Sequence, residues 1–287
     1  SVGRGNGVGG VNSDLVLTNG AVVTAANFSA GYDGGNAANR PKGSIAISGN
    51  STFTITGNGN FQLGESTGSD MTMTLSNSAQ VVATGTGIKR VGLFGTGTLN
   101  INDSALVNFG NQILYVGYRN GTGVVNQTSG TLNTIGQVRV GGSDTSGTGN
   151  FGFGTYNLNG GIVKLGGANP CLSVGRGNNN QNQTSGRFNI NGGDLWCTND
   201  VEIGYAGTNN YGWLTVNSGS FNVGPAATKW LQVGVWDFTS GRLEINGGAV
   251  NLMNSTSIKM NRQSGIPGPL GGNEVIQNGG TVNFYSD

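Results

Sequence analysis

The sequence predicts an all-β fold: a single-stranded parallel β-helix (solenoid) of about ten coils, with three short strands per coil. A glycine recurs after a small or apolar residue at intervals of 24 to 34 residues. One position of the repeat is always apolar, and no segment has helical periodicity. A near-constant period of this size is typical of solenoids. The recurring glycines are Gly3, Gly31, Gly64, Gly92, Gly117, Gly141, Gly175, Gly204 and Gly234.

One repeat unit can be read in the stretch from 187 to 204. Phe188 and Ile190 alternate with asparagines, which is the period of a strand with one buried face. Asn191-Gly192-Gly193 then forms a corner, because glycine adopts backbone angles that other residues avoid. A second alternating segment and a third short strand follow. Because each strand recurs once per coil, it pairs in parallel with its copies in the neighbouring coils.

The middle strand supplies two columns of residues that we expect to stack inside the solenoid. The first column is apolar throughout: Val22, Phe53, Val82, Val107, Leu132, Val163, Leu195, Phe221, Val250 and Val282. The second column, two positions on, includes three threonines: Thr24, Ile55, Thr84, Phe109, Thr134, Leu165, Cys197, Val223, Leu252 and Phe284. The intervening asparagines, Asn108, Asn133, Asn222 and Asn251, are expected to face outward.

In chain order, three polar stretches interrupt the coils and are expected to be loops: Asp33–Lys42, Gly142–Gly154 and residues 262–272. Residues 65–141 hold the most regular coils, and residues 176–261 hold the clearest Asn-Gly-Gly corners. We expect a single domain, 1–287. The alternative is a β-sandwich, but sandwiches do not repeat side-chain columns at a fixed period.

The composition restricts the possible partners. Glycine supplies 56 of 287 residues, charged residues are only 9%, and the net charge is +1. The charge therefore gives no argument for binding to nucleic acid. In addition, no apolar run is long enough to cross a membrane. Low charge with abundant Asn, Thr and Gly favours an extracellular or cell-surface protein of a bacterium.

The two cysteines are expected to face opposite ways. Cys197 lies in an inward column, whereas Cys171 precedes an inward leucine and should point outward. A disulfide between them is therefore not expected.

Several motifs resemble a known group of bacterial surface proteins. Gln127-Thr-Ser-Gly-Thr-Leu132, Gln183-Thr-Ser-Gly186 and the Asn-Gly-Gly corners resemble the β-strand repeats of autotransporter-type and PEP-CTERM-type glycine-rich proteins. The resemblance implies a right-handed parallel β-helix of pectin-lyase-like architecture. It indicates architecture more than function, because such repeats serve adhesins, matrix proteins and passenger domains alike.

An enzyme is the weakest of the functional hypotheses. A polysaccharide hydrolase needs paired carboxylates, and a lyase needs acidic calcium ligands with a basic residue. The only close acids are Asp194, Asp200 and Glu202, which need not converge, and the chain has no histidine. We therefore expect no catalytic residues, no metal site and no cofactor, with a polysaccharide lyase or hydrolase kept as the third hypothesis.

A glycan-binding face is a stronger hypothesis. Two residues before each closing glycine, an outward column reads Ser29, Gln62, Arg90, Tyr115, Arg139, Ser173, Glu202, Gln232 and Lys259. Flat aromatic rings and hydrogen-bonding groups along a rod suit an extended polysaccharide. With the residues that follow the glycines, the candidate face comprises Tyr32, Arg90, Tyr115, Tyr118, Arg119, Arg139, Arg176, Tyr205 and Trp236. The alternative is that these side chains only shield the outside of the sheet.

Seven Asn-X-Ser/Thr triplets are candidate glycosylation sites if the source glycosylates such sites. They are Asn27, Asn50, Asn102, Asn120, Asn126, Asn182 and Asn254.

The first functional hypothesis is a structural unit of an extracellular layer, sheath, fibre or adhesin stalk. The polysaccharide-binding module is the second. Copies of the chain are expected to join head-to-tail, with Ser1–Gly3 of one copy completing the coil begun by Thr281–Asp287 of another. The alternative is that these segments adjoin further repeats of a longer chain.

Overall fold

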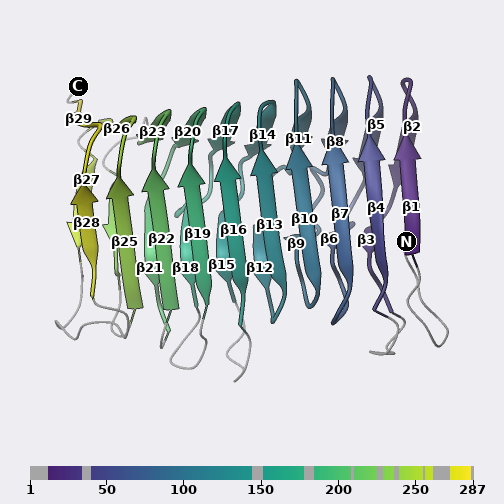
Figure 1. Ribbon diagram of the computed structural model, residues 1–287, viewed down its shortest axis with the longest axis horizontal. Helices are drawn as coiled ribbons and strands as arrows, with labels where there is room; N and C mark the ends of the chain where they lie inside the picture. The colour runs from purple at the N-terminus through teal and green to yellow at the C-terminus, as the bar shows by residue number, and fades with distance from the viewer. Residues whose placement is uncertain are drawn as a thin grey trace.

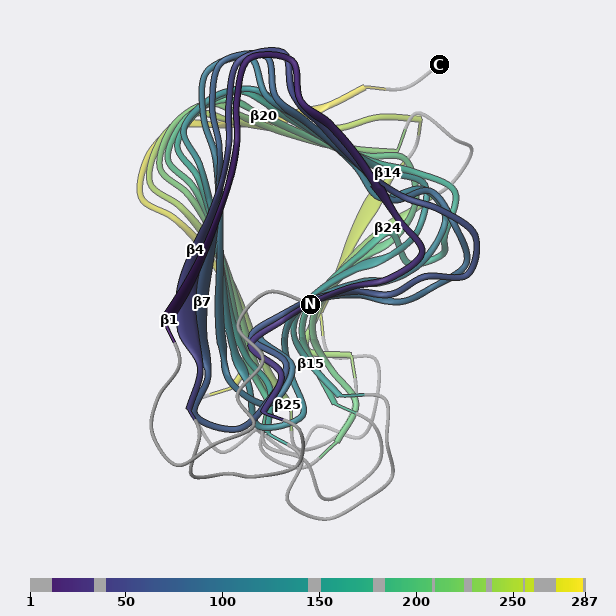
Figure 2. The same cartoon turned by 90° about the vertical axis from the view of Figure 1, so that its right-hand side faces the viewer.

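The computed structural model describes residues 12–33, 40–143, 151–177, 184–207, 210–224, 229–235, 239–254, 256–260 and 272–285. These residues form a parallel β-solenoid with three sheets and, within the described ranges, no helix (Figure 1). Viewed along the rod, the strands of successive turns superimpose on three sides (Figure 2). The fold class is therefore confirmed.

The first sheet contains ten parallel strands, most of which are six residues long. Its strands are β1 (Asn12–Leu17), β4 (Lys42–Ile47), β7 (Asp70–Leu75), β10 (Thr96–Ile101), β13 (Thr122–Gln127), β16 (Phe153–Leu158), β19 (Ser185–Ile190), β22 (Asn210–Val216), β25 (Thr239–Ile245) and β28 (Glu274–Gln277).

The second sheet also contains ten strands, each of three or four residues. They are β2 (Val22–Ala25), β5 (Thr52–Ile55), β8 (Gln80–Val82), β11 (Leu106–Asn108), β14 (Thr131–Thr134), β17 (Ile162–Leu165), β20 (Asp194–Cys197), β23 (Ser220–Val223), β26 (Ala249–Leu252) and β29 (Thr281–Phe284).

The third sheet contains nine strands among the described residues. They are β3 (Phe28–Ala30), β6 (Phe61–Leu63), β9 (Lys89–Val91), β12 (Leu114–Tyr118), β15 (Val138–Gly142), β18 (Leu172–Arg176), β21 (Val201–Tyr205), β24 (Trp230–Val233) and β27 (Ser257–Met260). Nine described turns supply a strand to every sheet and the last supplies two. The number of complete turns is therefore slightly below the predicted ten.

The recurring glycine closes each turn because no other residue fits there. Gly117 and Gly141 both have positive φ, +75° and +65°. A Cβ on Gly117 would lie 1.9 Å from the carbonyl oxygen of Phe153, and one on Gly141 would lie 2.1 Å from that of Ser185. The backbone at the end of the third sheet thus runs directly against the first sheet, which explains the period read in the sequence.

The core is a continuous stack of inward side chains. Phe109, Leu165, Val223 and Leu252 are buried as predicted, at 0–1% exposure. Rings also stack from turn to turn, as between Tyr156 and Phe188, whose centroids are 4.6 Å apart.

The predicted register of the second sheet is wrong in two strands. Phe53 pairs with Val23 and Val81, whereas Val22 is 72% exposed and Val82 faces outward. The inward positions that were assigned to Thr24 and Thr84 are accordingly occupied by Ala25 and Ala83. Both errors fall on a Val-Val pair, where either register presents an apolar residue and a slip of one residue reverses the face.

Cys171 is also misassigned by the alternation argument. Its side chain is fully buried in the same core as Cys197, and both residues are free thiols in this structure. Cys171 lies in the turn before β18, so strand alternation does not fix its direction. Its thiol donates to the carbonyl oxygens of Asn199 and Asp200, at 3.5 Å each.

Lys89 is a charged exception in the core. It occupies the inward column of the third sheet between Phe61 and Leu114, and it has no solvent-exposed surface. Its ammonium donates to the carbonyl oxygens of Gly85, at 3.0 Å, and of Gly87. Burial lowers the pKa of Lys89 to about 8.

Rows of asparagines link the turns from outside. On the first sheet, each amide donates to the asparagine of the preceding turn, along Asn100, Asn126, Asn157 and Asn189, at 2.8–3.0 Å. A second row follows the corner through Asn159, Asn191, Asn217, Asn246 and Asn278. Since one amide both donates and accepts, such a row continues indefinitely along a parallel sheet.

Candidate functional site

The predicted glycan-binding residues lie on the outer face of the third sheet, but this face is largely filled by its own side chains. Tyr115 and Tyr118 on β12 are each 1% exposed and form a small second cluster with Leu93. Their ring centroids are 4.4 Å apart. Two buried rings offer no free face on which a sugar could stack.

Arginines from the same turn and from the two neighbouring turns cover these rings. The guanidinium carbons of Arg90 and Arg119 lie 5.3 and 5.1 Å from the Tyr118 ring centroid, and that of Arg139 lies 5.4 Å from the Tyr115 centroid. Arg139 also donates to Gln137 at 2.6 Å. The sequence therefore placed the aromatic and basic residues correctly on one face, where they bind one another.

The polar network continues to the next turns. Gln137 donates to Ser173 at 2.9 Å, Ser173 donates to Glu202 at 2.8 Å, and Arg176 forms an ion pair with Glu202 at 2.6 Å. Burial raises the pKa of Glu202, and the nearby charge of Arg176 opposes this shift. Arg176 in turn lies 4.2 Å from the ring centroid of Tyr205.

The remaining predicted positions are less enclosed or fall elsewhere. Tyr32 is 37% exposed, and Tyr205 is partly buried. Trp236 lies outside the described residues. The structure thus brings Arg90, Tyr115, Tyr118, Arg119 and Arg139 together as one packed cluster.

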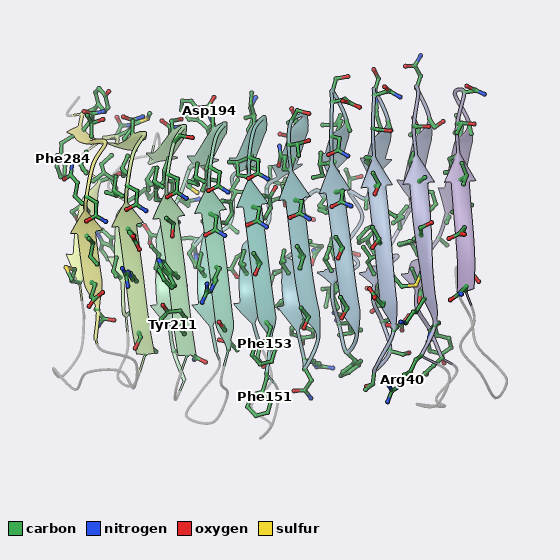
Figure 3. The ribbon with its side chains drawn as sticks, viewed as in Figure 1. Arg40, Phe151, Phe153, Asp194, Tyr211 and Phe284 are labelled. Carbon is green, nitrogen blue, oxygen red and sulfur yellow. The ribbon has the colours of Figure 1, made fainter. Side chains whose placement is uncertain are left out.

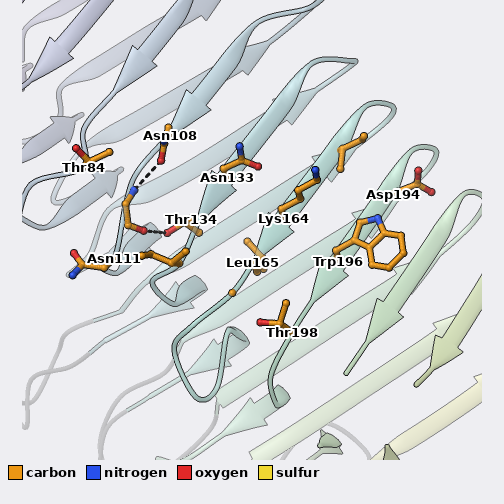
Figure 4. A pocket seen from close by; sticks show the side chains of 14 residues that line it. Thr84, Asn108, Asn111, Asn133, Thr134, Lys164, Leu165, Asp194, Trp196 and Thr198 are labelled. Carbon is orange, nitrogen blue, oxygen red and sulfur yellow. Dashed lines mark hydrogen bonds between the residues drawn. The ribbon is translucent and has the colours of Figure 1, made fainter. Parts of the chain in front are cut away.

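An open groove lies instead on the outer face of the second sheet. It has a volume of about 1110 Å³ and crosses the outward residues of β11, β14, β17 and β20 (Figure 4). Its lining residues are Thr84, Asn108, Gly110, Asn111, Asn133, Thr134, Ile135, Ile162, Lys164, Leu165, Gly166, Asp194, Trp196 and Thr198. Within the lining, Ile135 and Trp196 are exposed apolar side chains, at 61% and 37%.

A second hollow of about 470 Å³ lies on the far side of Trp196. It is lined by Trp196, Asn222, Asn251, Met253, Asn254 and Tyr285. Because Trp196 borders both hollows, they lie next to each other along the rod, and we refer to them together as the groove, which spans the strands from β11 to β26. With strands about 4.8 Å apart, six neighbouring strands give a length on the order of 25 Å.

The floor of the groove is one row of outward residues in register. Asn108, Asn133, Lys164, Trp196 and Asn222 are successive partners across five strands. After Trp196, towards the C-terminus, the row continues as a ladder of asparagine side chains, in which Asn251 donates to Asn222 at 2.7 Å. Before Trp196 the described asparagines do not form such a ladder. Asn108 accepts from the Gly110 amide at 3.2 Å, and the side-chain oxygen of Asn133 has no partner among the described residues.

The groove carries little charge. Among the described residues that line it, Lys164 and Asp194 alone are charged, and Asp194 already accepts a 2.6 Å hydrogen bond from Ser220. Figure 4 shows Lys164 and Trp196 side by side on neighbouring strands. The site therefore offers a flat indole, amide groups and one free ammonium, and sequence reasoning missed it. The available signal was the replacement of the repeated asparagine by Lys164 and Trp196.

The three clustered acids of the sequence do not share a site. Asp194 lies at the second sheet (Figure 3), Asp200 accepts the Trp230 amide at 2.9 Å, and Glu202 pairs with Arg176 on the third sheet. Over the described ranges, no group of three or more Cys, Asp or Glu residues is placed to hold a metal ion.

The candidate glycosylation sites differ in accessibility. Asn27, Asn50 and Asn120 are exposed, whereas Asn102, Asn126 and Asn254 are partly buried. Asn126 is committed to the first-sheet ladder, and Asn182 lies outside the described residues.

In the portion of the chain that the structure describes, no helix is sufficiently long and apolar to span a membrane. Comparisons with protein families, with curated proteins and with solved structures found no match to this chain.

Proposed function

We propose that the protein is an extracellular bacterial β-solenoid rod that binds an extended polysaccharide along the groove of the second sheet. The supporting observation is the exposed indole of Trp196 at the centre of a groove that runs parallel to the rod axis. A sugar ring has an apolar face of C–H groups that packs on an aromatic ring, and its hydroxyls both donate and accept hydrogen bonds.

The polar lining suits such a ligand. Asn108 and Asn133 present side-chain amides on the neighbouring strands β11 and β14, and Lys164 follows on β17, so a linear polymer that runs along the rod meets a polar group at each of these turns. Asp194 is the only carboxylate among the described lining residues. Since glycoside hydrolysis ordinarily uses two carboxylates, the groove favours binding over hydrolysis.

The test is calorimetric titration against soluble polysaccharides, both neutral and uronic-acid-containing. We expect binding to at least one of them, and Trp196→Ala to weaken it roughly tenfold or more, in line with the loss of one aromatic stacking contact. Trp213→Ala is the matched control, because Trp213 lies on the first sheet between Arg187 and Arg242 and should not alter affinity. Unchanged affinity in Trp196→Ala would contradict the proposal.

A second candidate is the purely structural unit of a surface layer, sheath, fibre or adhesin stalk. The asparagine rows and the continuous core favour it, because they stiffen the rod from turn to turn. Head-to-tail joining of Ser1–Gly3 to Thr281–Asp287 belongs to this proposal, and residues 1–3 and 286–287 lie outside the described part. Electron microscopy at high protein concentration tests it: continuous fibres support assembly and isolated rods contradict it.

A further inference from the structure

The two cysteines meet inside the rod, at the corner between the second and third sheets. Cys171 and Cys197 both have no exposed surface and belong to the same apolar core. The Cys171 thiol contacts the carbonyl oxygens of Asn199 and Asp200, two and three residues after Cys197. The neighbouring Cys171 thiol also contributes to the raised pKa of Cys197.

The contact joins neighbouring turns of the solenoid. The amide of Cys171 donates to the carbonyl oxygen of Asp200 at 3.0 Å, and β18, which follows Cys171, pairs with β21. Cys197 is the last residue of β20 in that next turn. The backbone is therefore held in register on both sides of the thiol pair, so a covalent link would connect segments that are already adjacent.

We propose that Cys171 and Cys197 form a disulfide bond that clamps two successive turns when the chain folds in an oxidising compartment. A cysteine thiolate attacks a small-molecule disulfide such as oxidised glutathione, forms a mixed disulfide and releases one glutathione thiolate. The second cysteine thiolate then attacks the mixed disulfide and releases the second glutathione. The protein loses two hydrogen atoms, and the oxidant is reduced to two thiols.

The burial of the two cysteine side chains restricts when the disulfide can form. Burial raises the pKa of Cys197 well above its usual value, with the neighbouring Cys171 thiol adding to the shift, so Cys197 forms little reactive thiolate in the folded protein. We therefore expect oxidation during folding or transient opening, and slow reaction of the folded, reduced protein with added oxidant.

The test uses the full chain, refolded from denaturant either with glutathione redox buffer or with reductant alone. Each sample is then unfolded, alkylated with iodoacetamide and weighed by intact mass spectrometry. We expect two alkylated cysteines after reduction and none after oxidative refolding, with a crosslinked peptide pair containing Cys171 and Cys197. The oxidised protein should also unfold at a higher denaturant concentration than the reduced protein.

Cys197→Ser is the matched control, because it leaves one thiol that cannot form the internal bond and should be alkylated or carry glutathione. If this variant does not fold, the mass measurement on the native sequence still decides. Two alkylated or glutathione-capped cysteines after oxidative refolding, or disulfide-linked dimers in place of the internal bond, would overturn the proposal. The outcome does not depend on polysaccharide binding, so the two proposals fail separately.

Discussion

The outer faces of the second and third sheets are built from equivalent repeating positions, yet only the second remains open. On the third sheet, Tyr115 lies in register between Arg90 and Arg139 and is 1% exposed. On the second sheet, Trp196 stands between Lys164 and Asn222 and is 37% exposed. The comparison teaches that the residues one turn above and below decide whether an outward ring is available to a ligand.

The difference follows from the length and chemistry of the neighbours. An arginine side chain reaches across the spacing between strands and places its planar guanidinium over an aromatic ring. Asn222 is too short to cover the indole and instead donates to the Leu195 carbonyl oxygen and to Ser220. A ring in a β-solenoid is thus a candidate ligand platform only where no arginine lies beside it in register.

The largest expected effect on stability concerns the covered outer face of the third sheet. Tyr118→Ala removes a buried ring that packs against Tyr115 and two guanidinium groups, so we expect the free energy of unfolding to fall by about 3–5 kcal/mol. Chemical denaturation measures the change. Polysaccharide affinity of the folded variant should stay unchanged, and a selective loss of affinity without a loss of stability would assign the ligand to the third sheet.

The next effect concerns the ion pair of the same face. Arg176→Met leaves the Glu202 carboxylate buried with Ser173 as its remaining hydrogen-bond donor, which should cost about 3 kcal/mol at pH 7. Without Arg176, the pKa of Glu202 rises further above that of the unfolded chain. A raised carboxyl pKa stabilises the folded state at low pH, and this contribution is lost as the pH rises through the folded-state pKa. The variant should therefore be less destabilised at pH 4 than at pH 7.

The control for this effect is the double variant Arg176→Met with Glu202→Gln, which removes the buried charge. Its stability should depend less on pH than that of Arg176→Met alone. Equal pH profiles for the single and double variants would show that the destabilisation comes from lost packing.

Much of the fold could be predicted from the sequence because the repeat imposes strong physical constraints. A closing glycine such as Gly117 has no room for a Cβ, so its period marks each turn directly. Inward residues such as Phe109 and Leu165 alternate with polar ones and define the face. Where the alternation is ambiguous, at Val22-Val23 and Val81-Val82, the prediction slipped by one residue.

The groove could not be predicted by the same reasoning, because its openness depends on contacts between residues about a turn apart. The sequence identifies Tyr115, Tyr118 and Trp196 equally well as outward aromatic residues. Which of them is covered depends on the pairing of strands and on the direction of long side chains. The same limit explains Cys171, whose turn has no alternation that would fix its direction.

A smaller effect concerns the inner side of the third sheet. Lys89→Met removes a buried ammonium that is held by two backbone carbonyl oxygens, so we expect the unfolding free energy at pH 7 to rise by about 1 kcal/mol. The pKa of Lys89 is lowered from 10.5 to about 8, so between these values the unfolded chain binds more protons. The free energy of unfolding of the wild-type protein should therefore rise relative to that of the variant as the pH rises from about 8 to 10.5. A difference that stays constant over this range would contradict the lowered pKa.

The last comparison, which includes the smallest expected effect on stability, is between two asparagines in one row of the second sheet. Asn251 donates to Asn222 at 2.7 Å and accepts from Asn283 at 2.8 Å, so Asn251→Ala breaks two ladder hydrogen bonds. This substitution should lower the free energy of unfolding by about 1–2 kcal/mol.

The side-chain oxygen of Asn133 lacks a partner within the described structure, so Asn133→Ala should change the free energy of unfolding by less than about 0.5 kcal/mol. If Asn133 instead serves the ligand, the same substitution weakens polysaccharide binding by roughly fivefold, the value of one neutral hydrogen bond. Denaturation and calorimetry on both variants separate the two roles. A stability loss at Asn133 equal to that at Asn251 would show that the row is a structural ladder throughout, and that the groove has no amide reserved for a ligand.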